Sequence, residues 1–117
     1  MRAAHLCIVR VQRQPAGDVV IPLVESDPYI RARVMVLAES IAKQTSISPE
    51  LQLGRSHLPS IVRARHALMA ALWRSGCSTS EVGAILGRDH STVIMALRKT
   101  LGADVYRAEL AARRVAA

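Results

Sequence analysis

The stretch from Ser78 to Leu97, STSEVGAILGRDHSTVIMAL, decides the fold that is predicted for this chain. Ser78 and Glu81 have the spacing of a capping box, in which each side chain accepts a hydrogen bond from the backbone N–H of the other residue. This pattern predicts a helix that starts at Thr79. Gly87 provides the positive φ that a tight turn requires, so it ends that helix. A second helix follows, capped by Asp89 and continuing to about Leu101.

Residues 79–98 fit the spacing of a helix-turn-helix, in which two helices cross closely over a tight turn. Gly83 lies where the helices cross, and a larger side chain there would hold them apart. Val82 and Val93 belong to the buried faces of the two helices. The start of the second helix is left exposed, and it carries the candidate base contacts of a duplex-binding protein: Arg88, Asp89, His90, Ser91 and Thr92.

The chemistry of these side chains suits the major groove of DNA. Asp89 can accept from the amine of cytosine, His90 and Ser91 can donate or accept, and Thr92 offers a methyl group to thymine. A structural interpretation also exists, in which Asp89 and Ser91 only cap the helix and His90 is merely exposed. Capping and base contact are compatible for Asp89, because each carboxylate oxygen can serve one of them.

The rest of the chain is predominantly helical in pattern, so the predicted fold is all-α, a multi-helix domain containing a helix-turn-helix. Asp27 with Pro28 and Ser48 with Pro49 are helix starts, and Ser60 is expected to cap a longer helix. Trp73 is expected in the core. The helices predicted outside the motif cover about residues 28–44, 49–53, 60–74 and 104–116.

Residues 1–26 have a different pattern and are expected to form an N-terminal extension to a domain that covers residues 27–117. His5–Gln12 and Val19–Glu25 are rich in β-branched residues and flank a segment with Pro15 and Gly17. The extension is predicted to be either a short β-hairpin or a flexible arm.

The charge of the chain is strongly positive and uneven. The 117 residues carry a formal net charge of +7, and residues 51–100 hold seven basic and two acidic side chains. A surplus of this kind indicates a polyanionic partner that binds the second half of the chain. In the helix predicted over residues 60–74, the face opposite the apolar one carries Arg63, Arg65, His66 and Arg74. Few aromatic residues are present, which favours duplex over single-stranded nucleic acid as that partner.

Composition excludes several other classes. A hydrophobic content of 50% is too high for intrinsic disorder, and no apolar run approaches the length of a membrane span. Cys7 and Cys77 lack metal-ligand spacing, so we expect free thiols and a cytoplasmic, nucleoid-associated protein. Lys43 and Lys99 do not follow the glycine that a P-loop requires, so no nucleotide or other cofactor is expected.

The segment Gly87-Arg88-Asp89-His90-Ser91-Thr92-Val93 resembles the signature near the C-terminus of the bacterial replication initiator DnaA. The helix Ile61–Leu72, IVRARHALMAAL, and the segment Ala38–Leu53 are similar to the helices that precede that signature. The resemblance covers about residues 35–101. It implies an all-helical domain, termed domain IV in DnaA, that binds the duplex site called the DnaA box.

The resemblance also assigns roles to individual positions. Base contacts fall on Asp89, His90 and Ser91, with adjacent contacts on Arg88 and Thr92. Arg55 is the candidate for the minor groove, and His57 is a weaker one. The candidate phosphate contacts are Arg65, Arg63, Ser80, Arg98 and Lys99.

Three departures from the family pattern affect what is predicted. The loop from Arg55 to Pro59 lacks the dense arginines that the family inserts in the minor groove. The turn before Arg88 is one residue shorter than in the family, which could rotate the second helix and change the preferred site. The chain also lacks the ATPase module of the initiator. The resemblance therefore implies a stand-alone regulator of replication or transcription, of bacterial or phage origin, acting as a monomer on an asymmetric box. The residues themselves leave the oligomeric state open.

Other functions remain to be weighed against DNA binding. The same helical domain could serve as a protein-interaction module, or as the DNA-targeting subunit of a transposase or recombinase system. An enzyme is not expected. The four histidines lack metal-ligand spacing, and Asp89 cannot readily orient His90 as a catalytic dyad, because neighbouring residues on a helix point in different directions.

Overall fold

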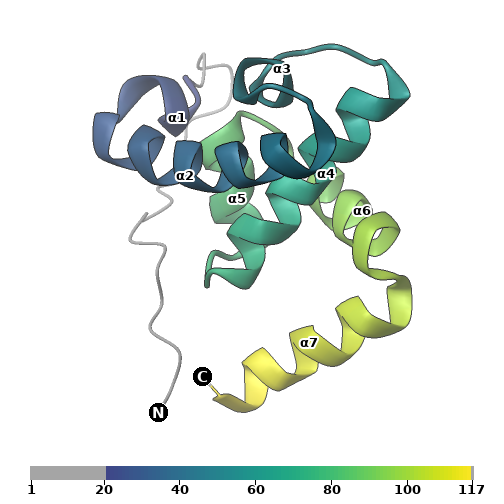
Figure 1. The fold of residues 1–117 in the computed structure, drawn as a ribbon. Coiled ribbons are helices and arrows are strands. Elements are labelled where there is room, and N and C mark those ends of the chain that lie inside the picture. The colour runs from purple at the N-terminus through teal and green to yellow at the C-terminus, as the bar shows by residue number, and fades with distance from the viewer. Residues whose placement is uncertain (1–20, 117) are drawn as a thin grey trace.

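A computed structural model of the protein describes residues 21–116, and this part of the chain contains seven helices and no strand (Figure 1). The helices are α1 (Leu23–Ser26), α2 (Pro28–Thr45), α3 (Pro49–Leu53), α4 (Pro59–Arg74), α5 (Thr79–Leu86), α6 (His90–Leu101) and α7 (Ala103–Ala116). The predicted all-α fold is confirmed.

Capping residues set the starts of three helices, as the sequence predicts. Ser48 Oγ accepts from the backbone N–H of Leu51 at 3.3 Å, which starts α3. The Asp27 carboxylate accepts from the backbone N–H of Tyr29 at 2.9 Å and of Ile30 at 3.2 Å, which starts α2. Both halves of the capping box are present at α5: Ser78 Oγ accepts from Glu81 N at 3.1 Å, and the Glu81 carboxylate accepts from Ser78 N at 2.7 Å. The start of the helix-turn-helix is therefore fixed by local hydrogen bonds.

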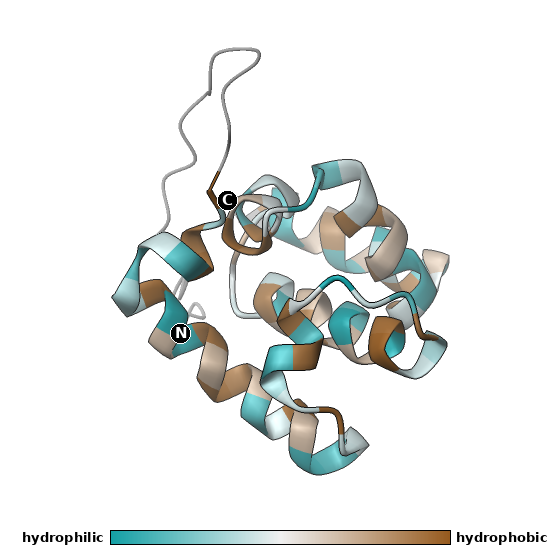
Figure 2. Cartoon of the chain, turned by 90° about the horizontal axis from the view of Figure 1, so that it is seen from above, coloured by the Kyte–Doolittle hydropathy of each residue, from teal (hydrophilic) through white to brown (hydrophobic). Residues whose placement is uncertain are grey.

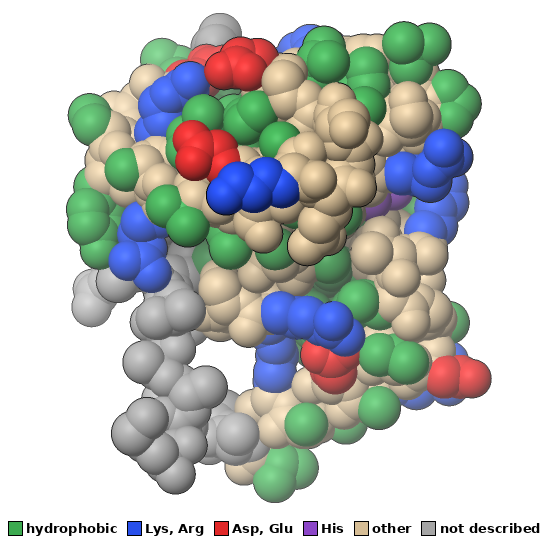
Figure 3. Space-filling view, in the orientation of Figure 1, with side chains coloured by type: hydrophobic (Ala, Val, Ile, Leu, Met, Phe, Trp, Pro, Cys, Tyr) green, Lys and Arg blue, Asp and Glu red, His purple; other side chains and the backbone are tan. Residues whose placement is uncertain are grey.

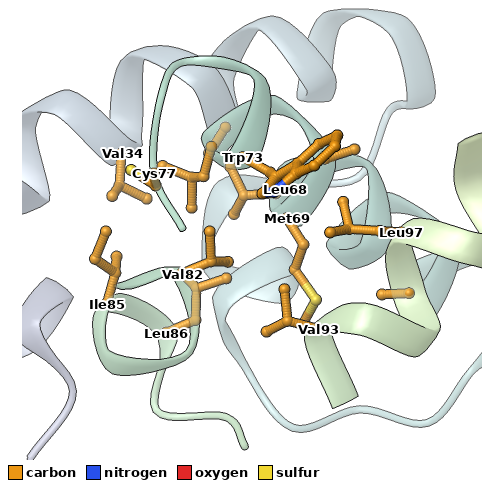
Figure 4. Packing of buried hydrophobic residues seen from close by; sticks show 14 of the residues in the cluster. Val34, Leu68, Met69, Trp73, Cys77, Val82, Ile85, Leu86, Val93 and Leu97 are labelled. Carbon is orange, nitrogen blue, oxygen red and sulfur yellow. The ribbon is translucent and has the colours of Figure 1, made fainter. Parts of the chain in front are cut away.

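Helix α4 is the centre of the fold. It packs on α2, α3, α5 and α6, and α1 closes the group by packing on α2 and α5. Figure 4 shows side chains of α2, α4, α5 and α6 pointing toward one another, among them Leu68, Met69 and Val82. Figure 2 shows hydrophobic and hydrophilic positions interspersed along the helices, and the buried hydrophobic ones form one core cluster. The core thus holds the two helices of the helix-turn-helix against the rest of the domain.

Helix α7 extends away from the helices around α4 (Figure 1). Long side chains nevertheless connect it to α4. The Arg74 guanidinium binds the Glu109 carboxylate with two hydrogen bonds, at 3.2 and 2.7 Å. Arg113 lies over the Trp73 ring, 3.8 Å from the ring centroid, and donates to the carbonyls of Trp73 and Cys77. Figure 3 shows basic and acidic side chains in contact between α4 and α7.

The strand expected over Val19–Glu25 is wrong in the part that the structure describes. Residues 23–26 form α1, and Val24 is buried in the core. Pro22 begins this helical turn by accepting hydrogen bonds from the backbone N–H groups of Glu25 and Ser26. The β-branched residues of this segment predict a strand, but packing of Val24 in the core favours a helical turn. The other predicted strand, His5–Gln12, lies outside the described residues.

Two smaller expectations are also corrected. The N-cap of α4 is Leu58, with no side-chain cap hydrogen bond, and Pro59 rather than Ser60 begins the helix. Proline tolerates the first helical position because the N–H it lacks would be unsatisfied there. Cys77 is buried and disulfide-bonded, so the expectation of a free thiol is wrong for this residue. The spacing of cysteines along the sequence does not determine their distance in space. Cys7, the other cysteine expected to be a free thiol, lies outside the described residues.

Candidate nucleic-acid interface

The first turn of α6 is the exposed end of the helix-turn-helix. Val93, Ala96 and Leu97 are buried on one side of α6, and this fixes which side faces solvent. Asp89 and His90 have side chains that are 70% and 60% exposed, and Ser91 is exposed next to them. The structure therefore brings the three candidate base-contacting residues together at one helix start.

Two glycines set the position of this helix start. A Cβ atom on Gly83 would lie 2.5 Å from the carbonyl oxygen of Arg88, and the Arg88 N–H donates to the Gly83 carbonyl at 2.9 Å. Gly87 has φ of 70°, which glycine adopts without strain. Pro22 packs against Gly87, where a Cβ would lie 2.4 Å from the proline ring. The turn is closed on both sides, so the orientation of α6 relative to α5 is fixed.

Asp89 occupies the N-cap position of α6, but its side chain makes no capping hydrogen bond to the backbone. The carboxylate instead accepts a hydrogen bond from the Ser91 hydroxyl, and its other oxygen lies 3.5 Å from Nδ1 of His90. The hydrogen bond from Ser91 is the main cause that lowers the pKa of Asp89, and His90 contributes less. The carboxylate is thus held ionised and exposed, available to a hydrogen-bond donor from outside.

Arg88 is turned away from solvent and toward a neighbouring loop. Its side chain donates to the carbonyl oxygen of Gly54 at 2.7 Å and is half-buried. Burial lowers the pKa of Arg88, and the nearby Arg55 lowers it further. In this structure the guanidinium of Arg88 is engaged within the protein, which differs from the exposed DNA contact that the sequence suggests.

Arg65 is the clearest departure from the sequence-based assignment. It is 7% exposed and donates to the carbonyl oxygens of Gln52 at 2.9 Å, Ser56 at 2.9 Å and Leu51 at 3.4 Å. Burial is the main cause that lowers its pKa, and Arg88 is the second. The phosphate contact expected of Arg65 does not fit this placement. The sequence could not show that Arg65 is buried, because the carbonyls that accept its hydrogen bonds come from residues outside α4.

The remaining candidates for phosphate and minor-groove contacts lie on the surface. Arg98 is exposed and lies 5.9 Å from the ring centroid of Tyr106, and Thr92 is half-buried in the first turn of α6. Figure 3 shows basic side chains and a histidine gathered beside α4 and α6. The other exposed candidates are Arg55, His57, Arg63, Ser80 and Lys99.

Gln52 supports the site and was not singled out from the sequence. Its side chain is completely buried, and Nε2 donates to the carbonyls of Ala38 and Ile47, both at 2.9 Å. Its own backbone carbonyl accepts from Arg65. Gln52 therefore ties α2 and α3 to the arginine on α4. A glutamine in a short helix is usually exposed, so the sequence gives no sign that Gln52 is buried.

Comparison with known families confirms what the geometry indicates. Residues 34–100 match the family described as the bacterial dnaA protein helix-turn-helix. The chain belongs to this DnaA helix-turn-helix family. The DnaA match supports DNA binding through the helix-turn-helix, and it identifies a DNA-binding module rather than a catalytic one. No curated protein and no solved structure gives a significant match.

The DnaA match covers most of α2, all of α3 to α5 and nearly all of α6, but α1 and α7 lie outside it. Helix α1 and the preceding Pro22, which packs against Gly87, are thus additions beside the matched residues. In residues 21–116, no cluster of His, Cys, Asp or Glu could hold a metal ion. Among the described helices, none has the length and apolar character of a membrane span.

His66 makes the stability of this DnaA-family domain dependent on pH. Burial is the main cause that lowers its pKa below the usual 6.5, and Lys99 and Arg65 lower it further. Because the native state disfavours the protonated form, the full free energy of unfolding is present above about pH 6.5. It falls as the pH drops from there toward the lower pKa of the folded protein, since the unfolded state binds more protons in that window.

Urea denaturation at about pH 7.5 and about pH 5.5 measures this effect. The free energy of unfolding is expected to fall at the lower pH, and His66→Gln should reduce that fall. His57→Gln, at an exposed position, is the matched control and should leave the fall unchanged. An equal fall in the unaltered chain and in His66→Gln would contradict the assignment.

Proposed function

We propose that this protein binds double-stranded DNA sequence-specifically by inserting the first turn of α6 into the major groove. The observation that carries the proposal is the exposure of Asp89, His90 and Ser91 at the start of α6, while the opposite side of α6 is buried. The N-terminal end of a recognition helix is the part that reads base edges in this motif. In this proposal, residues 27–117 together with α1 form the binding unit.

The roles of the individual residues follow from their groups. The ionised Asp89 accepts from an exocyclic amine, and His90 and Ser91 bind neighbouring base edges. Thr92, half-buried beside them, offers its methyl or hydroxyl group at the edge of the contact. Arg55 enters the minor groove from the loop before α4. The proposed phosphate contacts are Arg63, Ser80, Arg98 and Lys99, all exposed around this helix start.

The same proposal extends to the biological role. The family match supports a site that resembles the DnaA box, and the shortened turn before Arg88 supports an altered preference within it. In this proposal the protein acts by occupying such sites, as a cytoplasmic regulator of replication or transcription. Competition with the initiator DnaA for its boxes is the simplest form of that regulation.

Two substitutions test the proposed interface by their different patterns of loss. His90→Ala is expected to weaken binding to a specific duplex by about 1–3 kcal/mol and to leave binding to a scrambled duplex unchanged. Lys99→Ala is expected to weaken binding to both duplexes and to reduce the slope of log affinity against log salt by about one. Fluorescence anisotropy with labelled duplexes measures both.

Arg33→Ala is the control, because it removes the same charge from an exposed position on α2. It should change neither affinity. Equal losses on both duplexes for His90→Ala would remove the base-reading role of this residue. Binding that ignores salt in every variant would favour a protein-interaction module instead.

A further inference from the structure

The loop between α3 and α4, residues 54–58, is tied to the helix-turn-helix by one side chain. Arg88, in the turn before α6, donates to the carbonyl oxygen of Gly54 at 2.7 Å, across 34 residues of sequence. A charge-assisted hydrogen bond of this length is among the stronger ones in proteins. It links the loop that carries Arg55 to the residue immediately before Asp89.

The backbone of Arg88 is held as firmly as its side chain. Its N–H donates to the Gly83 carbonyl, and its own carbonyl lies where a Cβ on Gly83 would come within 2.5 Å. Arg88 therefore cannot move relative to α5 without breaking the close crossing of the two helices. Its side chain transmits that fixed position to the loop.

A second arginine completes the attachment of the loop. Arg65 on α4 donates to the carbonyls of Leu51, Gln52 and Ser56, on both sides of Gly54. The two arginines bind the inward carbonyls of this segment, while the Arg55 side chain between those attachment points is exposed. Three cations gather here, since Arg55 acts electrostatically on Arg88 and Arg88 acts on Arg65.

We propose that Arg88 is a positioning residue, which fixes the loop carrying Arg55 relative to the first turn of α6 and does not itself contact DNA. This inference rests on the proposed function, because it assigns the loop and α6 to one DNA interface. Under it, the arginine in the Gly87–Val93 segment serves to hold two DNA-contacting elements at a set separation. Binding of Arg55 in the minor groove then depends on how its loop is placed relative to the first turn of α6 in the major groove.

A double-mutant cycle on the full chain tests whether Arg88 acts through Arg55. Arg55→Ala and Arg88→Ala are each expected to weaken binding to a specific duplex about tenfold. The double variant should lose little more than either single variant, because both changes remove the same contact. Arg55→Ala combined with Lys99→Ala is the control pair, and its losses should multiply.

Two further measurements distinguish positioning of the loop by Arg88 from a general loss of structure. They are the salt dependence of DNA binding and the backbone order of residues 54–58. Arg88→Ala and the double variant should lower the salt slope by no more than Arg55→Ala does alone. In the free protein, backbone order parameters of residues 54–58 should fall in Arg88→Ala toward about 0.6 or below. Arg88→Lys keeps a donor and a charge, so it should restore part of the order and part of the affinity.

The outcomes separate this inference from the proposed function. Losses that multiply for Arg55→Ala with Arg88→Ala would overturn it, because Arg88 would then contact DNA independently. Unchanged loop order in both Arg88 variants would overturn it as well. If the unaltered chain bound no duplex, the proposed function would fail, and the order of the loop in the free protein would alone decide whether Arg88 holds it.

Discussion

Replacing Trp73 with alanine is expected to lower the free energy of unfolding by about 3–5 kcal/mol. Trp73 is 1% exposed, and its ring centroid lies 5.3 Å from that of Tyr106 on α7. The Arg113 guanidinium lies over the Trp73 ring and donates to the Trp73 carbonyl. Truncation would leave a cavity in the core and remove the surface on which α7 packs. A loss of this size is a large fraction of the stability of a small domain.

Urea denaturation followed by circular dichroism measures this loss, because the variant lacks the tryptophan used for fluorescence. Hydrogen exchange across residues 103–116 should become faster in Trp73→Ala, since α7 loses the ring that Tyr106 and Arg113 contact. Trp73→Phe is the control and should cost less, because it keeps an aromatic ring beside Tyr106. A loss below about 1 kcal/mol for Trp73→Ala would contradict the packing described for α7.

Replacing Gly83 with alanine is expected to destabilise the domain by about 1–3 kcal/mol and to weaken DNA binding. Glycine to alanine inside a helix normally stabilises by about 0.5–1 kcal/mol, so the sign of the effect is diagnostic. The added Cβ would meet the Arg88 carbonyl at 2.5 Å, and this backbone oxygen can retreat only if α6 moves. The displacement would reach Asp89 and His90 directly.

Thermal unfolding and duplex binding measure the two effects of Gly83→Ala. The reverse change at the neighbouring position, Ala84→Gly, is the control and reports helix propensity in α5 without the clash. It should cost about 1 kcal/mol and leave the preference for the specific duplex intact. An increase in stability in Gly83→Ala would show that the two helices do not cross as closely as described.

Much of the fold could be predicted from the sequence, because its helices start and end with local signals. Asp27, Ser78 and Glu81 make the predicted capping hydrogen bonds, and Gly87 has the predicted positive φ. The apolar periodicity also placed Val93 in the core correctly. These features depend on residues within one or two turns of each other, so a single sequence contains them.

The parts that could not be predicted depend on contacts between distant segments. Val24 forms part of a helical turn because it packs in the core, although its local pattern suggests a strand. Arg65 and Arg88 have the composition of DNA-contacting residues, yet each binds carbonyls that lie 9 to 34 residues away. Which surface an arginine faces is decided by the tertiary fold, and charge alone does not report it.

The most direct test of DNA binding through α6 is affinity as a function of salt for two duplexes of equal composition, one carrying a DnaA box and one scrambled. Binding through α6 predicts affinity that falls steeply with salt on both duplexes. It also predicts tighter binding to a box, or to a variant of the box recovered by selection from random duplexes. Absence of binding at low salt, or binding with no preference after selection, would contradict it.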